Sequence, residues 1–207
     1  MTVVNQRAGA DYLVGPVSPD EVLVPEEMGE EPRAMMQSMR DFAAQEIEPV
    51  ADLLEQRDEA THRSLFKKAA ELGIFMAEVP EEYGGLGRSV LGIAGMMESR
   101  SYFDSFSSTA FAHQGIGCLP LINFGTEAQI DKYLERLMNG ELMACFALTE
   151  PSSGSDAMNI KTTAVLSEDQ THFIVNGSKQ FITNAGFADI FILFAKVDGQ
   201  QFTAFML

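Results

Sequence analysis

Apolar residues recur at helical spacing along the first two-thirds of the chain. Met35, Met39 and Phe42 are four and three residues apart, which places them on one face of a helix. The same spacing continues to Leu54, and Pro49 should kink or restart this long helix, because proline lacks an amide hydrogen. Similar patterns predict further helices across residues 61–72, 89–102 and 107–114.

Short polar signals mark where two of the helices begin or end. Gly73 should end the helix across 61–72, since glycine readily takes the left-handed conformation of a C-cap. Thr126 and Gln129 form a capping-box pattern, in which each side chain can satisfy the other residue's amide. The helix that begins there should end at Asn139-Gly140.

After residue 140 the apolar residues lie in short runs bounded by turns. Asn176-Gly177 and Asp198-Gly199 are typical of hairpin turns. Strands that are joined by turns rather than helices favour an antiparallel sheet or barrel. The predicted strands are residues 143–148, 162–166, 173–175, 179–183, 190–197 and 201–207.

The pattern as a whole predicts an α+β protein. An all-α helical domain should be followed by an incomplete antiparallel β-barrel or sheet domain. The expected divisions are an N-terminal extension (1–25), the helical domain (26–142) and the middle β-domain (143–207).

Composition and charge exclude several classes of protein. Apolar residues make up 46% of the chain and charged residues 21%, as in an ordinary globular protein. The net charge of −16 disfavours binding to nucleic acids or anionic membranes. Two cysteines, Cys118 and Cys145, are too few for a disulfide framework. Without a signal peptide pattern or an apolar run long enough to span a bilayer, we expect a cytoplasmic protein.

A polar loop follows the first predicted strand. Residues Thr149–Asp156 combine Pro151 and Gly154 with three serines, so that hydroxyl and amide groups can face a ligand. Such a loop suits an anionic group such as a pyrophosphate. The alternative is a plain polar turn between strands.

A second segment, Phe181–Asn184, offers an aromatic ring, an apolar side chain and a hydroxyl in sequence. The ring could pack against a flat cofactor while polar groups satisfy the cofactor's edge. The alternative is that Phe181 belongs to the core.

Three other residues invite functional interpretations that we consider weaker. His113 is expected to be a packed or surface helix residue, because no second metal ligand lies near it in sequence, and no metal site is predicted. Lys179 is interpreted as a surface charge of a hairpin. Glu150 is a poor candidate for a catalytic base, since it belongs to the turn that shapes the polar loop.

Several motifs together resemble the acyl-CoA dehydrogenase family. Cys145–Asp156 resembles its signature, and Asn176–Asn184 resembles its second flavin segment, with Ala188-Asp189 following. Upstream, Pro80–Gly87 resembles its Gly-rich loop, and Gly125–Gln129 resembles its next helix start. The Ser-Ser-Gly-Ser-Asp form of the signature is similar to the long-chain and very-long-chain branch.

The resemblance implies that FAD is the cofactor and that two segments of this chain surround it. Thr149 would hydrogen-bond the flavin's polar edge, and Ser155 would also contact the substrate's CoA portion. Phe181, within the second flavin segment, stands where the family usually has Trp, and Ala185, directly after that segment, stands where it usually has Gly. The implied cofactor-binding residues are Phe146, Leu148, Thr149, Gly154, Ser155, Phe181, Ile182 and Thr183.

The implied activity is the FAD-dependent α,β-dehydrogenation of fatty acyl-CoA to trans-2-enoyl-CoA, a step of fatty acid β-oxidation. Electron-transfer flavoprotein is the implied electron acceptor, and the complete protein would be a homodimer or homotetramer. Acyl-CoA oxidase and a non-catalytic flavin- or acyl-CoA-binding protein remain alternatives.

The resemblance also implies a C-terminal four-helix domain that carries the catalytic Glu, and this domain is absent from the sequence. The sequence stops within a strand pattern at Phe205–Leu207, so we expect a truncated chain with no catalytic residue of its own. Expressed alone, it should be inactive and bind FAD weakly.

Overall fold

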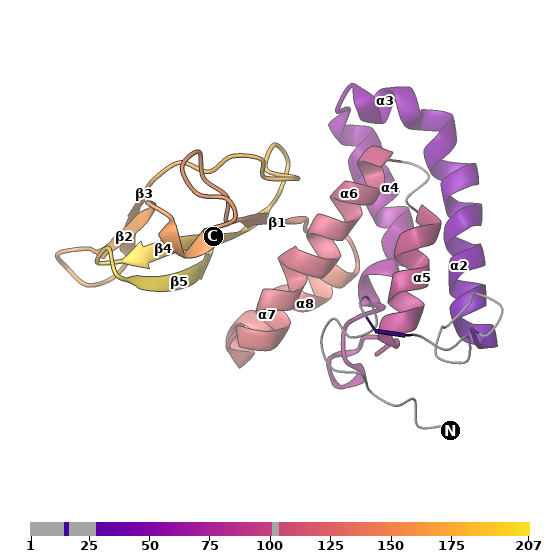
Figure 1. Cartoon of the computed structure of the whole chain (residues 1–207), viewed down its shortest axis with the longest axis horizontal. Helices are drawn as coiled ribbons and strands as arrows, with labels where there is room; N and C mark the ends of the chain where they lie inside the picture. Colours follow the sequence, from indigo (N-terminus) through magenta and orange to yellow (C-terminus); the bar gives the residue numbers. More distant parts are fainter. Residues whose placement is uncertain (1–14, 17–27, 101–103) are drawn as a thin grey trace.

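The computed structural model describes residues 15–16, 28–100 and 104–207. Figure 1 shows helices α2 to α6 gathered on one side, the sheet on the other, and α7 and α8 between them. Most of the expected N-terminal extension and the end of the helix expected across 89–102 lie outside the described residues. Within the described part of the chain, no helix has the length and apolar character needed to cross a membrane.

The first long helix is interrupted where Pro49 predicts it. α2 (Glu30–Phe42) passes into a π-helical turn, η3 (Ala43–Ile47), and a 3₁₀ turn, η4 (Glu48–Val50). α3 (Ala51–Glu55) then resumes the helix. The predicted kink is therefore confirmed.

α4 (Glu59–Glu71) lies beside α2 and α3. Asp58 caps its start by accepting a hydrogen bond from the Thr61 amide at 2.8 Å. Gly73 follows its end in the left-handed conformation, with φ of 75°, as predicted. α5 (Val90–Arg100) packs along α2, after the short turns η5 (Ile74–Met76) and η6 (Glu81–Tyr83).

The last helices lead to the sheet. α6 (Asp104–Phe111) continues through a π-helical segment, η7 (Ala112–Cys118), into α7 (Leu119–Phe124). α8 (Glu127–Met138) begins at the predicted capping box, in which the Gln129 amide donates to Thr126 Oγ1 at 3.3 Å. The predicted end at Asn139-Gly140 is also confirmed.

The five strands form one open, mixed sheet. They are β1 (Ala144–Ala147), β2 (Thr163–Leu166), β3 (Phe173–Asn176), β4 (Ile190–Val197) and β5 (Gln201–Met206). β4 is central: β1 and β2 pair with it in parallel, whereas β5 pairs with it antiparallel. β3 pairs antiparallel with β2. The order of helices followed by a sheet is confirmed, but the sheet is mixed where an antiparallel one was expected.

One predicted hairpin is correct and the other is wrong. Asp198 and Gly199 both have positive φ and connect β4 to β5, as expected for an Asp-Gly turn. Asn176-Gly177 leads to no return strand, and residues 179–183 are irregular. Gly177 lies against Thr162, whose Oγ1 would be 2.2 Å from a Cβ at this position. The segment after β3 therefore folds across the start of β2 instead of pairing with β3.

Candidate functional site

The two segments predicted to bind the cofactor lie side by side. The Gln180 amide donates a hydrogen bond to the Thr149 carbonyl oxygen at 3.0 Å. Next to it, Lys179 Nζ donates to the Leu148 carbonyl oxygen, also at 3.0 Å. The backbone after β1 and the backbone before Phe181 are thus joined into one wall.

The polar loop after β1 is held by its own hydrogen bonds. Glu150 and Ser153 exchange two backbone hydrogen bonds, and Ser153 Oγ donates to the Asp156 carbonyl oxygen at 2.5 Å. Gly154 and Ser155 lie at the exposed rim of this turn. No atom lies within 4 Å of a Cβ built on Gly154, so the rim is open to a ligand.

Glu150 lies beneath the loop and is only 4% exposed. Its carboxylate accepts hydrogen bonds from the Lys161 amide at 2.5 Å, the Thr162 amide at 3.0 Å and Lys179 Nζ at 2.8 Å. The Thr162 hydroxyl donates to the same carboxylate. Burial by itself raises the pKa of Glu150, but the hydrogen bonds, led by that from Lys179, outweigh it and lower the pKa to about 2.

The environment of Glu150 corrects the interpretation of Lys179. Its side chain is only 11% exposed and pairs with a buried carboxylate, so it is not a surface charge of a hairpin. The pair fastens the polar loop to the segment that carries Phe181.

Phe181 is not a core residue. Its side chain is 87% exposed, and its φ of 56° is unusual for a residue other than glycine. The structure thus presents an aromatic ring to the outside, one residue after the hydrogen bond between Gln180 and Thr149.

Ile182 and Thr183 border a hollow of about 540 Å³, which lies between the irregular segment 182–187 and helices α3, α4 and α6. Thr109 of α6 lies on the same hollow. Phe146 borders a different, largely apolar groove of about 530 Å³ beside α7, and its ring packs on Phe194 at 4.8 Å. The structure therefore joins the backbones of the two segments, while the ring of Phe146 lies on another hollow than Ile182 and Thr183.

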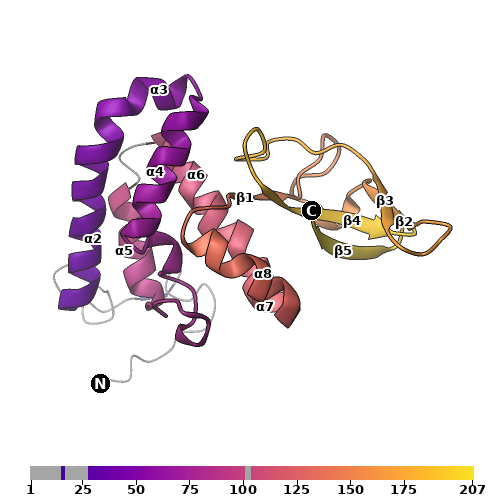
Figure 2. The same cartoon turned by 180° about the vertical axis from the view of Figure 1, so that it is seen from behind.

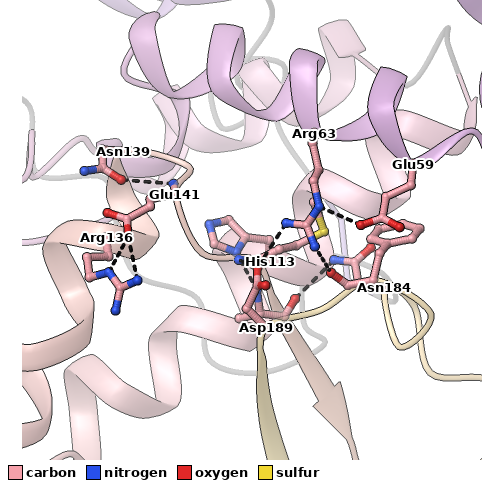
Figure 3. Close-up of polar contacts among 11 residues, drawn as sticks. Glu59, Arg63, His113, Arg136, Asn139, Glu141, Asn184 and Asp189 are labelled. Atoms are coloured by element: carbon pink, nitrogen blue, oxygen red, sulfur yellow. Dashed lines mark hydrogen bonds and ion pairs between the residues drawn. The ribbon is translucent and has the colours of Figure 1, made fainter.

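Three residues connect the helices to the segments that flank this wall, namely the start of β1 and residues 184–189 (Figure 3). Arg63 of α4 donates to Asp189 at 3.2 Å and to the Phe187 carbonyl oxygen at 2.9 Å. His113 accepts a hydrogen bond from the Ala144 amide at 3.0 Å. The third contact is made by Asn184, whose side-chain nitrogen reaches α6 and β1.

His113 is a fully buried structural residue, which confirms that it is packed. Its Nδ1 accepts from Ala144, so its Nε2 carries the hydrogen that the Leu137 carbonyl oxygen accepts at 3.0 Å. Burial lowers the pKa of His113 to about 4, so the ring is neutral at pH 7. The rings of Phe66 and Phe75 pack on it at 4.9 and 4.5 Å.

Burial also keeps the two thiols protonated, because it raises the pKa of Cys118 and of Cys145 to about 12. In the ranges that the structure describes, no group of three or more His, Cys, Asp or Glu side chains could hold a metal ion.

Sequence reasoning missed the contacts of Lys179, Arg63 and Asn184. One signal was present for the first of these, because an acidic residue directly after an apolar strand needs a partner if it is buried. No local signal identifies Arg63 or Asn184, whose partners lie far away in sequence.

A helical part, an adjoining open sheet and a wall built from two strand-end segments define the class of protein. Residues 29–141 match the model of the acyl-CoA dehydrogenase N-terminal domain, and residues 145–207 match that of the acyl-CoA dehydrogenase middle domain. The chain therefore belongs to the acyl-CoA dehydrogenase family, and the resemblance seen in its motifs is confirmed.

Individual relatives agree with this assignment. The chain is 45% identical over 201 residues to a probable acyl-CoA dehydrogenase of Bacillus subtilis, covering 97% of this chain and 34% of that protein. It is 40% identical to the human mitochondrial very long-chain specific acyl-CoA dehydrogenase, covering 80% of this chain and 27% of that protein.

A solved structure is similar as well. The acyl-CoA dehydrogenase of Bacillus anthracis, complexed with FAD, superimposes with a TM-score of 0.89 at 45% identity. The match covers 96% of this chain and 34% of that one. The chain thus spans about a third of the length of these two proteins of Bacillus subtilis and Bacillus anthracis.

Proposed function

We propose that the complete protein is an FAD-dependent acyl-CoA dehydrogenase and that this chain supplies part of its flavin and substrate site. The reaction removes one hydrogen from each of the α and β carbons of a fatty acyl-CoA thioester and gives trans-2-enoyl-CoA. The observation that carries this proposal is the hydrogen bond between Gln180 and Thr149, which joins the two flavin segments into one wall.

The residues present fit a flat cofactor with a pyrophosphate. Phe181 offers an exposed apolar ring, and the exposed hydroxyl of Thr183 lies two residues further on. The rim at Gly154 and Ser155 is open and polar, which suits phosphate oxygens. Lys179 compensates the negative charge of Glu150 beneath this rim, which lowers the repulsion of an anionic ligand.

A bound FAD would supply the two-electron oxidant for the reaction. The chain's own residues would bind and orient the cofactor: Thr149 and Thr183 would hydrogen-bond its polar edge, and Phe181 would pack on an apolar part of it. Leu148 and Ile182 would supply further contacts to the cofactor, whereas Phe146 would reach it only from the separate groove beside α7. Ser155 also binds the CoA portion of the substrate.

Glu150 does not remove the α-proton. A base must accept a proton near neutral pH, but the pKa of Glu150 is lowered to about 2 by its hydrogen bonds, which outweigh the opposing effect of burial. We propose that the base is a Glu in the C-terminal helical domain of the complete protein. Electron-transfer flavoprotein is the proposed acceptor, and the complete protein acts as a homodimer or homotetramer.

FAD binding and turnover test the proposal separately. After incubation with FAD and gel filtration, the complete protein should retain flavin absorbance, whereas this chain alone should bind FAD weakly. Thr183→Val, which removes only a hydroxyl, should weaken FAD binding about tenfold, as expected for the loss of a ligand hydrogen bond. Thr203→Val on β5 is the matched control and should leave binding unchanged.

The complete protein should oxidise a fatty acyl-CoA with an artificial electron acceptor, and this chain alone should not. Turnover by this chain alone would contradict the assignment of the base to another domain. Stoichiometric peroxide release under air would identify the complete protein as an oxidase instead.

A further inference from the structure

Asn184 joins three segments that are distant in sequence. Its Nδ2 donates to the carbonyl oxygen of Thr109 in α6 at 3.0 Å and to that of Ala144 in β1 at 3.1 Å. The residue is only 6% exposed, so these hydrogen bonds are shielded from water. Asn184 also directly follows Thr183 of the proposed flavin wall.

The orientation of the Asn184 amide is determined by its partners. Both are carbonyl oxygens, so the nitrogen must face them and the oxygen must point elsewhere. Among the residues that the structure describes, Asn184 Oδ1 is buried and has no hydrogen-bond partner. A buried acceptor without a partner destabilises the folded state. The two hydrogen bonds that the amide nitrogen donates must therefore offset this cost by fixing the segments that they join.

The backbone of Asn184 is fixed as firmly as its side chain. Its φ of 71° lies in the left-handed region, which asparagine tolerates better than most residues. Its carbonyl oxygen accepts hydrogen bonds from the amides of Phe187 at 3.0 Å and Ala188 at 2.8 Å. The chain therefore turns sharply at Asn184, and Thr183 cannot shift without moving this turn.

This arrangement controls the geometry of the hollow described above. Ile182 and Thr183 lie on one side of it, and Thr109 lies on another. Asn184 connects these two sides through the carbonyl oxygen of Thr109. A catalytic wall has to be held within a fraction of an ångström, and a buried hydrogen bond across its base can do this.

We propose that Asn184 is a positioning residue: it sets Thr183 and Ile182 against α6 and β1 so that the flavin wall has its binding geometry. This inference rests on the proposed function. The alternative is that Asn184 only holds the helices and the sheet together.

Arg63 provides a matched control for that alternative. It also connects a helix to the same loop, through the Phe187 carbonyl oxygen and Asp189, but it does not adjoin Thr183. If Asn184 only held the helices and the sheet together, Arg63→Ala and an Asn184 variant of equal thermal stability should lose the same amount of FAD affinity.

The experiment uses two Asn184 variants of the complete protein. Asn184→Gly keeps the left-handed backbone accessible and removes both donor bonds. Asn184→Asp keeps the size of the side chain and turns a carboxylate toward two carbonyl oxygens. We expect both variants to bind FAD about tenfold more weakly than the wild type, which corresponds to ~1.4 kcal/mol, and to alter the visible circular dichroism of bound FAD. Arg63→Ala should change FAD affinity less than about twofold at a comparable loss of thermal stability.

Amide hydrogen exchange without FAD gives an independent readout. In both Asn184 variants, exchange should become faster at the hydrogen-bonded amides of Gln180, Ala185 and Ala188, whereas Arg63→Ala should leave the amide of Gln180 unchanged. Unchanged exchange there, or equal losses of FAD affinity in the Asn184 and Arg63 variants, would overturn the proposal. If the wild type itself failed to bind FAD, the proposed function would fall, and the exchange data would still decide whether Asn184 holds the segment.

Discussion

The helical part and the sheet differ in how far their apolar side chains are exposed. In the helical part, Phe66 and Phe75 are each 1% exposed and Leu137 is fully buried. In the sheet, Val165 is 49% exposed and Ile174 is 50% exposed. Figure 2 shows the same separation from behind, with the sheet standing beside the helices. The core around Phe66 and Phe75 is therefore built mainly by the helices, and Leu137 belongs to a second core cluster that α7 and α8 share with β1 and β4. In contrast, β2 and β3 leave apolar side chains exposed.

The largest expected effect compares one phenylalanine from each part. Phe75→Ala should lower the free energy of unfolding by about 4 kcal/mol, because it opens a cavity in the closed helical core. Phe173→Ala should lower it by less than about 2 kcal/mol, since this ring is 41% exposed and packs on Phe205. Urea unfolding of both variants measures this difference, and equal losses would contradict the contrast between the two parts.

A somewhat smaller effect should come from the buried ion pair in the strand part. Glu150→Gln should destabilise the protein by about 3 kcal/mol, because it leaves the ammonium of Lys179 buried without its counter-charge. Lys179→Met should cost about 2 kcal/mol, since three donors from Lys161 and Thr162 still satisfy the carboxylate.

The double variant tests whether these two residues act as a pair. Its loss of unfolding free energy should be clearly less than the sum of the two single losses. Strictly additive losses would show that the ion pair contributes nothing beyond its separate contacts.

Acid should affect the two parts in different pH ranges. Because burial lowers the pKa of His113 from 6.5 to about 4, the helical part is fully stabilised above pH 6.5 and loses up to about 3 kcal/mol as pH falls toward 4. The pKa of Glu150 falls from 4.5 to about 2, because its hydrogen bonds outweigh the opposing effect of burial; its contribution is therefore lost below pH 4.5. Urea unfolding at a series of pH values should show both ranges. In His113→Gln the slope between pH 6.5 and 4 should flatten, and a titration of His113 near 6.5 by NMR would contradict the assignment.

The smallest effect concerns the thiols, which should not react at all in the native protein. Burial raises the pKa of Cys118 and Cys145 to about 12, so a thiol reagent at pH 8 should label neither within minutes. In moderate urea, the Cys118→Ala variant should react before the Cys145→Ala variant, because its remaining thiol lies on β1, a strand of the open sheet. Rapid labelling of the native protein would show that one of the two parts opens readily.

The sequence predicted those elements whose causes are local. The capping box at Thr126, the kink at Pro49 and the turn at Asp198-Gly199 depend on neighbouring residues, and all three are present. The range of β4 is also as predicted. The strand expected at residues 179–183 is absent because Thr149 and Glu150, about thirty residues earlier, capture that segment. The parallel pairing of β1 with β4 has no local signature at all.

The residues of the candidate site also fall into those that local sequence predicts and those that it does not. Phe181 and the polar loop are recognisable because their chemistry lies in consecutive residues. The importance of Asn184 is not, since its partners Thr109 and Ala144 lie 75 and 40 residues away. The cytoplasmic location and the individual cofactor contacts stay predictions.

The parallel pairing of β1 with β4 also has a kinetic consequence. Residues 148–189 form a closed loop between these two strands, and both segments of the proposed flavin wall lie inside that loop. Closing a long loop costs entropy that is recovered only when the strands pair, so this step should follow the collapse of the more local helical contacts. During refolding, the helices should therefore form first, and the capacity to bind a ligand should appear only when β4 reaches β1.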